Sequence, residues 1–251
     1  MEHSFLNRIP IAHRGLHQGC PENSLPAFEA AIQAGYAIET DVRLTKDHKL
    51  VIFHDDTLTR MTGVEKRVID CTYEELCTYR LEGSDEIPLF TDFLKLLAGR
   101  VPLLLEIKNV PEVGRELFLK QIADEMKDYQ GEVTMQSFQP FYVRDFKRLR
   151  PDILCGLLAT AQSEKSDFDG SALWRVKAHI VKHMSLNFLI KPDFISYNFS
   201  DLPTRKTKKF KGIKLAWTIR SEKDAAYALR YADNIIFENW LAPLKTVDEN
   251  E

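Results

Sequence analysis

Long apolar segments are missing from this sequence, and no stretch approaches the ~20 consecutive apolar residues that a helix needs to cross a bilayer. The N-terminal residues also lack the basic segment and apolar run of a secretory signal peptide. Positive charge is not in excess either, since the formal net charge is -3, whereas nucleic-acid-binding domains are usually basic. These absences predict a cytoplasmic protein with no stable membrane association and no nucleic-acid partner.

Cysteine is scarce, and none of the 4 cysteines has a partner at CxxC spacing. A chain of 251 residues can bury enough apolar surface to fold without a disulfide framework. We therefore expect free thiols in a reducing compartment. The lack of a Cys or His cluster with zinc spacing argues against a zinc site. Because no linker, repeat or low-complexity segment divides the sequence, residues 1–251 are expected to form a single domain.

What the sequence does contain is a series of short apolar segments separated by helical patterns. Alternating strands and helices predict a parallel sheet, and eight such units in about 250 residues fit an α/β fold of the TIM-type (β/α)8 barrel class. One candidate strand, 50–53, follows its predecessor too closely for a helical crossover. We assign it to a small insertion after the second strand, at approximately 46–100. The candidate strands are 9–12, 37–42, 50–53, 102–107, 133–138, 153–158, 194–197, 215–219 and 234–237.

Helix signals lie between these strands. Ser24 is a candidate N-cap, and Pro26 falls in the first turn of the helix that would follow it. A later helix is indicated by Leu117, Ile122 and Met126, which lie near helical spacing. Both helices fit the positions that crossovers of a parallel barrel would occupy.

Residues able to carry chemistry follow the early strands, at the ends where the site of such a barrel lies. Glu39 and Asp41 are two residues apart on one strand and therefore point to the same face. Glu106 has the same relation to Lys108. A single carboxylate of this kind is often only a structural ion pair. Three that converge are costly to bury without a cation, so Glu39, Asp41 and Glu106 predict a site for one hard divalent cation.

Two histidines at these strand ends, His13 and His54, have ordinary pKa values near neutrality. Phosphodiester cleavage needs one group that takes a proton and another that gives one, which this pair could supply. Arg14 and Lys108 can bind phosphate oxygens. For Lys108, a purely charge-balancing role beside the carboxylates remains open. The remaining histidines, including His17 in the loop after the first strand, are assigned to the surface or to helices.

Several segments together resemble the glycerophosphodiester phosphodiesterase family. The resemblance is dense over residues 9–110 and thinner afterwards. The matching segments are 13–15 and 21–24 (HRG…PENS), 39–42 (ETDV), 51–58 (VIFHDDTL), 106–108 (EIK), 137–138 (SF) and 217–218 (WT).

This resemblance implies metal-dependent hydrolysis of a small-molecule glycerophosphodiester to glycerol 3-phosphate and an alcohol. It also implies roles for individual residues. They are acid–base catalysis for His13 and His54, binding of Mg²⁺ or Ca²⁺ (or Mn²⁺) for Glu39, Asp41 and Glu106, phosphate contacts for Arg14 and Lys108, and a pocket wall near the organic group for Trp217.

Other functions remain open at this point. The same histidines and metal could serve a phospholipase, or a lyase that forms a cyclic phosphate, and a catalytically inactive phosphodiester-binding scaffold is a third alternative. The last strand departs from the family's T-D-x-P pattern, and Glu238 is a candidate replacement for its acid. The basic run at 205–214 is expected to be solvated, and the long connection 161–191 to hold a packed helix. The oligomeric state is not indicated.

Overall fold

The computed structural model describes residues 4–161, 175–176, 179, 182 and 184–244. Within these residues the nine predicted strands are present, and their ends differ from the predicted ones by at most two residues. They are β1 (Ile11–His13), β2 (Ala37–Leu44), β3 (Leu50–Ile52), β4 (Leu103–Ile107), β5 (Val133–Ser137), β6 (Leu154–Ala159), β7 (Phe194–Asn198), β8 (Ile213–Ile219) and β9 (Asn234–Phe237).

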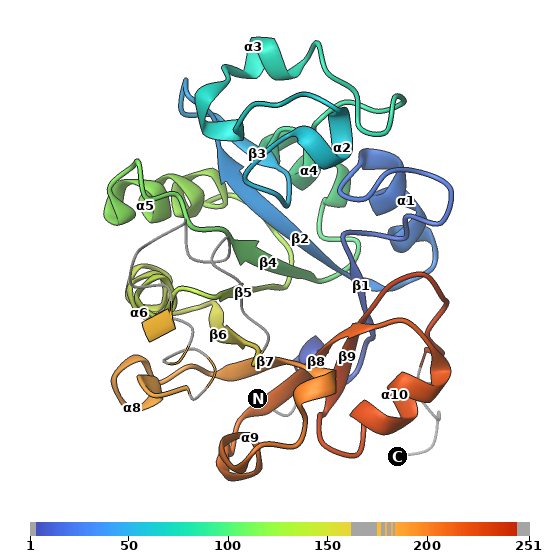
Figure 1. Cartoon of the computed structure of the whole chain (residues 1–251), viewed down its shortest axis with the longest axis vertical. Helices are drawn as coiled ribbons and strands as arrows, with labels where there is room; N and C mark the ends of the chain where they lie inside the picture. The colour runs from blue at the N-terminus through green and yellow to red at the C-terminus, as the bar shows by residue number, and fades with distance from the viewer. Residues whose placement is uncertain (1–3, 162–174, 177–178, 180–181, 183, 245–251) are drawn as a thin grey trace.

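All of these strands belong to one sheet, in the order β1-β9-β8-β7-β6-β5-β4-β2-β3. Since β1 also pairs with β2 in parallel, the eight parallel strands close into a barrel. Strand β3 pairs antiparallel with β2 and lies outside the ring (Figure 1). The predicted (β/α)8 barrel is confirmed, and β3 is the extra strand.

Helices surround the sheet in Figure 1. The longer ones are α1 (Leu25–Gln33), α4 (Phe90–Leu97), α5 (Arg115–Glu125), α6 (Pro140–Leu149) and α10 (Glu222–Ala228). The shorter ones are η1 (Phe5–Asn7), α2 (Thr59–Thr62), η2 (Val68–Asp70), α3 (Tyr73–Leu76), α8 (Asn187–Ile190), η4 (Phe199–Asp201) and α9 (Arg205–Lys209). As predicted, Ser24 caps α1, because its side chain accepts a hydrogen bond from the Ala27 backbone N–H.

Alternation along the strands separates two packed regions. On β2, Ile38 and Val42 face the large apolar core shared with the surrounding helices. Strand residues of the other parity face the barrel interior. At the amino-terminal ends of the strands this interior is apolar, and it includes Phe5 and Leu6 of η1, both fully buried. The apolar residues thus fill the amino-terminal half of the interior and leave its carboxyl-terminal half to polar side chains.

The segment between β3 and α4 has a small apolar core of its own, to which Phe53, Leu58 and Met61 belong. Helices α2 and α3 lie in this segment, at the top of Figure 1. Helix α4, although it falls within residues 46–100, packs against α1 and β3 as a crossover helix between β2 and β4. The segment from β3 to α4 therefore places the residues after β3 beside the barrel mouth.

Two predicted surface features have different outcomes. In α9 the basic residues are exposed, as expected for a solvated run, and Thr207 is the buried residue of that helix. Most of the connection 161–191, in which a packed helix was predicted, lies outside the described residues. No helix within the described ranges combines the length and apolar character needed to span a membrane.

Candidate active site

A cleft of about 330 Å³ opens at the carboxyl ends of the barrel strands. It is lined by the polar strand ends on one side and by Phe138, Leu158, Asn198 and Trp217 on the other. The structure therefore brings the predicted site residues together, with the fully buried Asp41 beside them. Those in the cleft wall are His13, Arg14, Glu39, His54, Glu106, Lys108 and Trp217.

Three carboxylates form the base of the site. Glu39 and Asp41 lie on β2 and Glu106 on β4, where the sheet register pairs it with Asp41. All three are buried, and each offers one oxygen within 4.8 Å of the others. Burial, together with the charges of Asp41 and Glu106, raises the pKa of Glu39 well above its usual value. Such a set is poorly stable as three free anions, so it fits a bound divalent cation and could hold one.

Lys108 contributes a positive charge to the same cluster. Its Nζ lies 2.9 Å from Oδ1 of Asp41 and also pairs with Glu106. Burial opposes ionisation of Asp41, but Lys108, His54 and Arg14 outweigh it and hold its pKa well below the ordinary range. Lys108 is also part of the cleft wall, so both of the roles considered for it remain compatible with its position.

Asn23 explains one of the sequence motifs in structural terms. Its Nδ2 donates to Oδ2 of Asp41 at 3.0 Å, and its Oδ1 accepts from Oγ1 of Thr40 at 2.7 Å. Asn23 has a φ of 57°, a left-handed conformation that Asn tolerates better than most residues. The PENS segment thus orients a buried carboxylate through Asn23 and caps α1 through Ser24.

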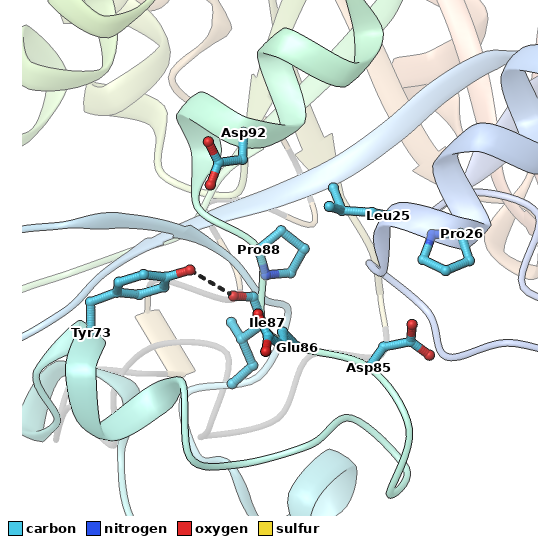
Figure 2. Close-up of a pocket in the computed structure, with 8 residues that line it drawn as sticks. All are labelled: Leu25, Pro26, Tyr73, Asp85, Glu86, Ile87, Pro88 and Asp92. Carbon is cyan, nitrogen blue, oxygen red and sulfur yellow. Dashed lines mark hydrogen bonds between the residues drawn. The ribbon is translucent and has the colours of Figure 1, made fainter.

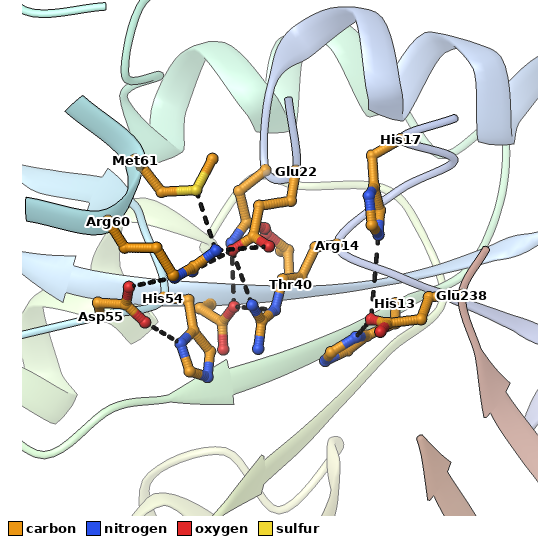
Figure 3. A network of polar contacts seen from close by, with 12 residues as sticks. His13, Arg14, His17, Glu22, Thr40, His54, Asp55, Arg60, Met61 and Glu238 are labelled. Carbon is orange, nitrogen blue, oxygen red and sulfur yellow. Dashed lines mark hydrogen bonds and ion pairs between the residues drawn. The ribbon is translucent and has the colours of Figure 1, made fainter. Parts of the chain in front are cut away.

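His13 is held by Glu238, an acid at the end of β9. The Nδ1 atom of His13 lies 2.5 Å from Oε2 of Glu238 (Figure 3). The other oxygen of Glu238, Oε1, accepts from Nε of Arg220 at 2.7 Å. Burial and the nearby charge of Arg14 lower the pKa of His13, although Glu238 opposes this shift. With Nδ1 engaged in this way, Nε2 is the nitrogen left for the cleft, 3.9 Å from Glu39.

His54 is held in the same manner from the opposite side. Its Nδ1 lies 2.6 Å from Oδ1 of Asp55, and Arg60 donates to the other oxygen of Asp55 (Figure 3). Burial and the charge of Lys108 lower the pKa of His54 to about 3. Both histidines are therefore neutral at pH 7 in this arrangement, and each has a carboxylate that orients its ring.

Arg14 follows β1 in a left-handed conformation, with a φ of 56°. Its Nη1 donates to Oε1 of Glu22 at 2.7 Å. Its Nε is buried and, among the described residues, has no hydrogen-bond partner, although Asp41 lies 3.6 Å away. Gly15 allows this turn to press against α1, because a Cβ there would meet the Ala27 backbone at 2.7 Å. An unpaired buried guanidinium N–H beside the carboxylates is a donor available to an anionic ligand.

The remaining wall of the cleft combines apolar side chains with polar ones that are mostly uncharged. Trp217 packs edge-on against Phe138 with ring centroids 5.8 Å apart. Nε1 of Trp217 and Oε1 of Gln136 are buried and have no hydrogen-bond partners in the described part of the chain. This side can therefore offer an aromatic surface, one donor and one acceptor to the organic part of a ligand.

Several residues around the site were not predicted as members of it. Glu22, Asn23 and Asp55 lie within recognised motifs, which was a usable signal, but nothing in the local pattern distinguished Arg60. His17 was assigned to the surface. Its side chain is only 16% exposed, and its Nε2 lies 4.0 Å from Glu238, so that assignment is wrong because the β1–α1 loop folds back over the site.

A separate pocket of about 310 Å³ lies between α1 and the segment before α4 (Figure 2). Its polar residues are acidic apart from Tyr73, whose hydroxyl donates to the backbone oxygen of Ile87 at 3.5 Å. It contains no histidine and none of the predicted site residues. The cleft at the barrel mouth is therefore the better candidate for the active site.

Known proteins share sequence similarity with this chain over most of its length. Residues 13–239 match the model of the glycerophosphoryl diester phosphodiesterase family. The chain belongs to this family of phosphodiesterases. A putative glycerophosphodiester phosphodiesterase of Bacillus subtilis is 31% identical over 229 residues, which cover 86% of this chain and 88% of that protein. A glycerophosphodiester phosphodiesterase of Bacillus altitudinis is 34% identical over 159 residues, 59% of this chain and 65% of the relative.

A solved structure gives the same result for the fold. A phosphodiesterase of Oleispira antarctica, in complex with the product sn-glycerol-3-phosphate, superposes with a TM-score of 0.75 and 23% sequence identity. The superposition covers 92% of this chain and 93% of that one. At this identity the likeness supports the barrel and leaves the substrate to be argued from the cleft itself.

Proposed function

We propose that this phosphodiesterase hydrolyses glycerophosphodiesters to glycerol 3-phosphate and an alcohol, with the help of one divalent cation. The observation that carries the proposal is the shared cleft. Three buried carboxylates, two carboxylate-oriented histidines and an unpaired arginine N–H all face or border it. This combination provides a cation site, an acid–base pair and a phosphate contact within one small volume.

Glu39, Asp41 and Glu106 would hold the cation, for which Mg²⁺ or Ca²⁺ is the first expectation and Mn²⁺ an alternative. Carboxylate oxygens are the ligands that these hard cations prefer. When bound, the cation would polarise a phosphoryl oxygen and offset charge that develops on it. It would also remove the repulsion among the three carboxylates that raises the pKa of Glu39.

Arg14 and Lys108 are proposed to bind the nonbridging oxygens of the phosphate. Nε of Arg14 has no hydrogen-bond partner among the described residues and lies 3.6 Å from Oδ2 of Asp41, and a guanidinium suits a planar pair of oxygens. Lys108 pairs with Asp41 and Glu106 in the structure. With the carboxylates engaged elsewhere, its ammonium can turn to the phosphate as a point charge.

His13 and His54 are proposed as the acid–base pair. One takes a proton from the attacking water, and the other gives a proton to the departing alkoxide. Glu238 and Asp55 hold the Nδ1 atoms, which leaves the two Nε2 atoms for these transfers. The base must start as a neutral imidazole, whereas the acid must first take up a proton at Nε2. The carboxylate behind its ring, together with the negative charge of the bound diester, would stabilise that imidazolium until it gives the proton to the alkoxide.

A small water-soluble diester fits the cleft better than an intact lipid. The cleft volume of about 330 Å³ suits a headgroup with glycerol, and Trp217 offers an aromatic face to the organic part.

The four cysteines are free, as predicted, which agrees with a reducing compartment and with a cytoplasmic location as part of this proposal.

The experiment is a metal-supplemented activity panel of glycerophosphodiesters with different headgroups, with phosphorus NMR of the products. We expect glycerol 3-phosphate from deacylated diesters and little or no cleavage of diacyl phospholipid in vesicles. A cyclic phosphate product would identify a lyase instead, and faster cleavage of vesicle lipid would identify a phospholipase. No turnover with any diester and metal would contradict the proposal and support a binding scaffold.

A further inference from the structure

Arg60, in the segment inserted between β3 and α4, does not line the cleft, but it contacts two acids that hold cleft residues. One is Asp55, the partner of His54, and the other is Glu22, the partner of Arg14 (Figure 3). A single guanidinium thus lies between the group proposed for proton transfer and the group proposed for phosphate binding.

The contact with Asp55 uses one edge of the guanidinium. Nε of Arg60 donates to Oδ2 of Asp55 at 2.6 Å, while Oδ1 of Asp55 is 2.6 Å from Nδ1 of His54. Because both carboxylate oxygens are engaged, Asp55 cannot rotate without losing one of these contacts. The orientation of the His54 ring is therefore tied to the position of Arg60.

The contact with Glu22 uses the other side of the same group. Nη2 of Arg60 donates to Oε1 of Glu22 at 2.5 Å, and Nη1 donates to Oε2 at 3.1 Å. Oε1 of Glu22 also accepts from Nη1 of Arg14 at 2.7 Å. Glu22 is therefore held between two guanidinium groups, and its position fixes the direction of the Arg14 side chain.

Burial and geometry separate this network from ordinary surface ion pairs. The side chains of Glu22 and Asp55 are only 14% and 23% exposed, although Arg60 itself is 47% exposed. A single exposed ion pair contributes little to stability. Bidentate arginine–carboxylate contacts within a network contribute more and hold the side chains in a fixed geometry. Lysine could not reproduce the arrangement, because a point charge cannot donate in fixed directions to two separate carboxylates.

We propose that Arg60 is a positioning residue that aligns His54, through Asp55, and Arg14, through Glu22, for the same substrate. This inference rests on the proposed function, since it assigns a purpose to the two groups that Arg60 connects. Arg60 lies in the segment before α4 and Glu22 in the β1–α1 loop. The contact between these two chain segments therefore holds both groups in place at once.

Arg67 provides a matched control from the same segment. It pairs with Asp56 at 2.9 Å and with Glu112 in the loop after β4, so it also bridges the inserted segment to the barrel. Its side chain is 38% exposed, comparable to Arg60. Among the described residues, neither of its acidic partners forms an ion pair with His54 or Arg14. Asp56 is linked to His54 only at the backbone oxygen, through Arg43. If these substitutions acted only by loosening the inserted segment from the barrel, Arg60→Ala and Arg67→Ala would be affected alike.

The experiment compares wild type, Arg60→Ala, Arg60→Lys, Glu22→Gln, the double variant Arg60→Ala/Glu22→Gln and Arg67→Ala. Steady-state kinetics with a deacylated glycerophosphodiester, calorimetric binding of sn-glycerol 3-phosphate and melting temperatures are measured for each. We expect Arg60→Ala to lower kcat and raise KM, with a total loss in kcat/KM of about 10- to 100-fold, typical of residues that orient a functional group. Arg67→Ala should keep near wild-type kinetics with a similar melting temperature.

Further outcomes separate positioning from a structural role. Arg60→Lys should recover only part of the activity, and the double variant should lose little more than the worse single variant, because the two residues share one network. Equal losses in Arg60→Ala and Arg67→Ala, or wild-type kinetics in Arg60→Ala, would overturn the inference while the proposed function stands. An inactive wild type would overturn the proposed function. In that case, glycerol 3-phosphate binding that is weaker in Arg60→Ala than in wild type, but unchanged in Arg67→Ala, would still support the positioning of Arg14 by Arg60.

Discussion

The Nδ1 atom of His13 lies 2.5 Å from Oε2 of Glu238, a residue 225 positions later in the chain. The contact joins the first and last strands of the barrel, which are neighbours because β1 pairs with β9. Glu238, the candidate replacement for the acid of the family's usual T-D-x-P segment, uses its second oxygen to accept from Arg220. The departure of the last strand from the family pattern thus affects the orientation of a proposed catalytic histidine.

Glu238→Gln should therefore lower kcat by about 10- to 100-fold, as expected when the partner that orients a functional imidazole is altered. The amide keeps the size of the side chain, but it cannot stabilise an imidazolium by charge. Steady-state kinetics of the variant, with Glu222→Gln on α10 as a control, test this expectation. Unchanged turnover would show that Glu238 has no role in positioning His13.

The same variant should change the acid stability of the protein. Burial opposes ionisation of Glu238, but the hydrogen bond and charge of His13, with Arg220, lower its pKa from 4.5 to about 2. A carboxyl whose pKa is lower in the folded state stabilises the fold above its unfolded pKa, and this stabilisation is lost as the pH falls through the folded pKa. The free energy of unfolding should therefore fall more steeply in wild type than in Glu238→Gln between about pH 4.5 and 2. Urea titrations across that range measure the difference.

Divalent cations should stabilise the protein through the carboxylate cluster. Binding to the folded state alone raises the melting temperature with cation concentration. Mg²⁺, Ca²⁺ or Mn²⁺ should therefore raise the melting temperature of chelator-treated wild type, and the shift should be much smaller in Glu106→Gln. Activity should disappear in chelator and return with the cation. Full activity in excess chelator would contradict a metal-dependent reaction.

The fold was predictable because its information is local. Side chains alternate along β2, so that Ile38 and Val42 face the helices while Glu39 and Asp41 face inward. This alternation can be read from the order of neighbouring residues. Helix phase was less secure: Leu117 was grouped with the apolar stripe of α5, yet it is 69% exposed, whereas Phe118 beside it is fully buried. Adjacent apolar residues leave the inner face ambiguous by about one position.

The candidate site was predictable only as far as its motifs reach. Residues at strand ends were recognised because a parallel barrel collects those ends at one mouth. The contacts that orient them were not predicted, since Glu238 lies 225 positions from His13 and Arg60 lies 38 positions from Glu22. Pairings at such separations depend on barrel closure and on the path of the inserted segment, which no local pattern encodes.

His13→Ala and His54→Ala should each reduce turnover by about 10²- to 10⁴-fold, the usual cost of a lost acid or base. Because the two histidines act on one reaction coordinate, the double variant should lose far less than the product of the single losses. Single-turnover assays with saturating cation measure all three. A variant that keeps near wild-type turnover would exclude that histidine from catalysis.

Lys108→Met distinguishes between two roles that are both compatible with the position of Lys108: phosphate binding and charge balance beside the carboxylates. The Lys108 ammonium lies 2.9 Å from Oδ1 of Asp41 and pairs with Glu106, so it balances charge when no cation is bound. If it also binds phosphate, its loss should lower kcat/KM by about 10- to 100-fold, because a hydrogen bond from a charged group contributes roughly 1.5–3 kcal/mol. We expect this loss with cation affinity nearly unchanged.

A charge-balancing role alone gives a different pattern. Without Lys108 the cation-free cluster holds uncompensated negative charge, so the melting temperature in chelator should fall and saturating cation should restore both stability and turnover. Measuring kinetics and melting with and without cation distinguishes the two. Lys120→Met is the control, since within the described part of the chain Lys120 forms an ion pair only with Asp124 and its side chain is 63% exposed on α5. A kinetic defect that persists at saturating cation in Lys108→Met, and is absent from Lys120→Met, assigns Lys108 to the phosphate.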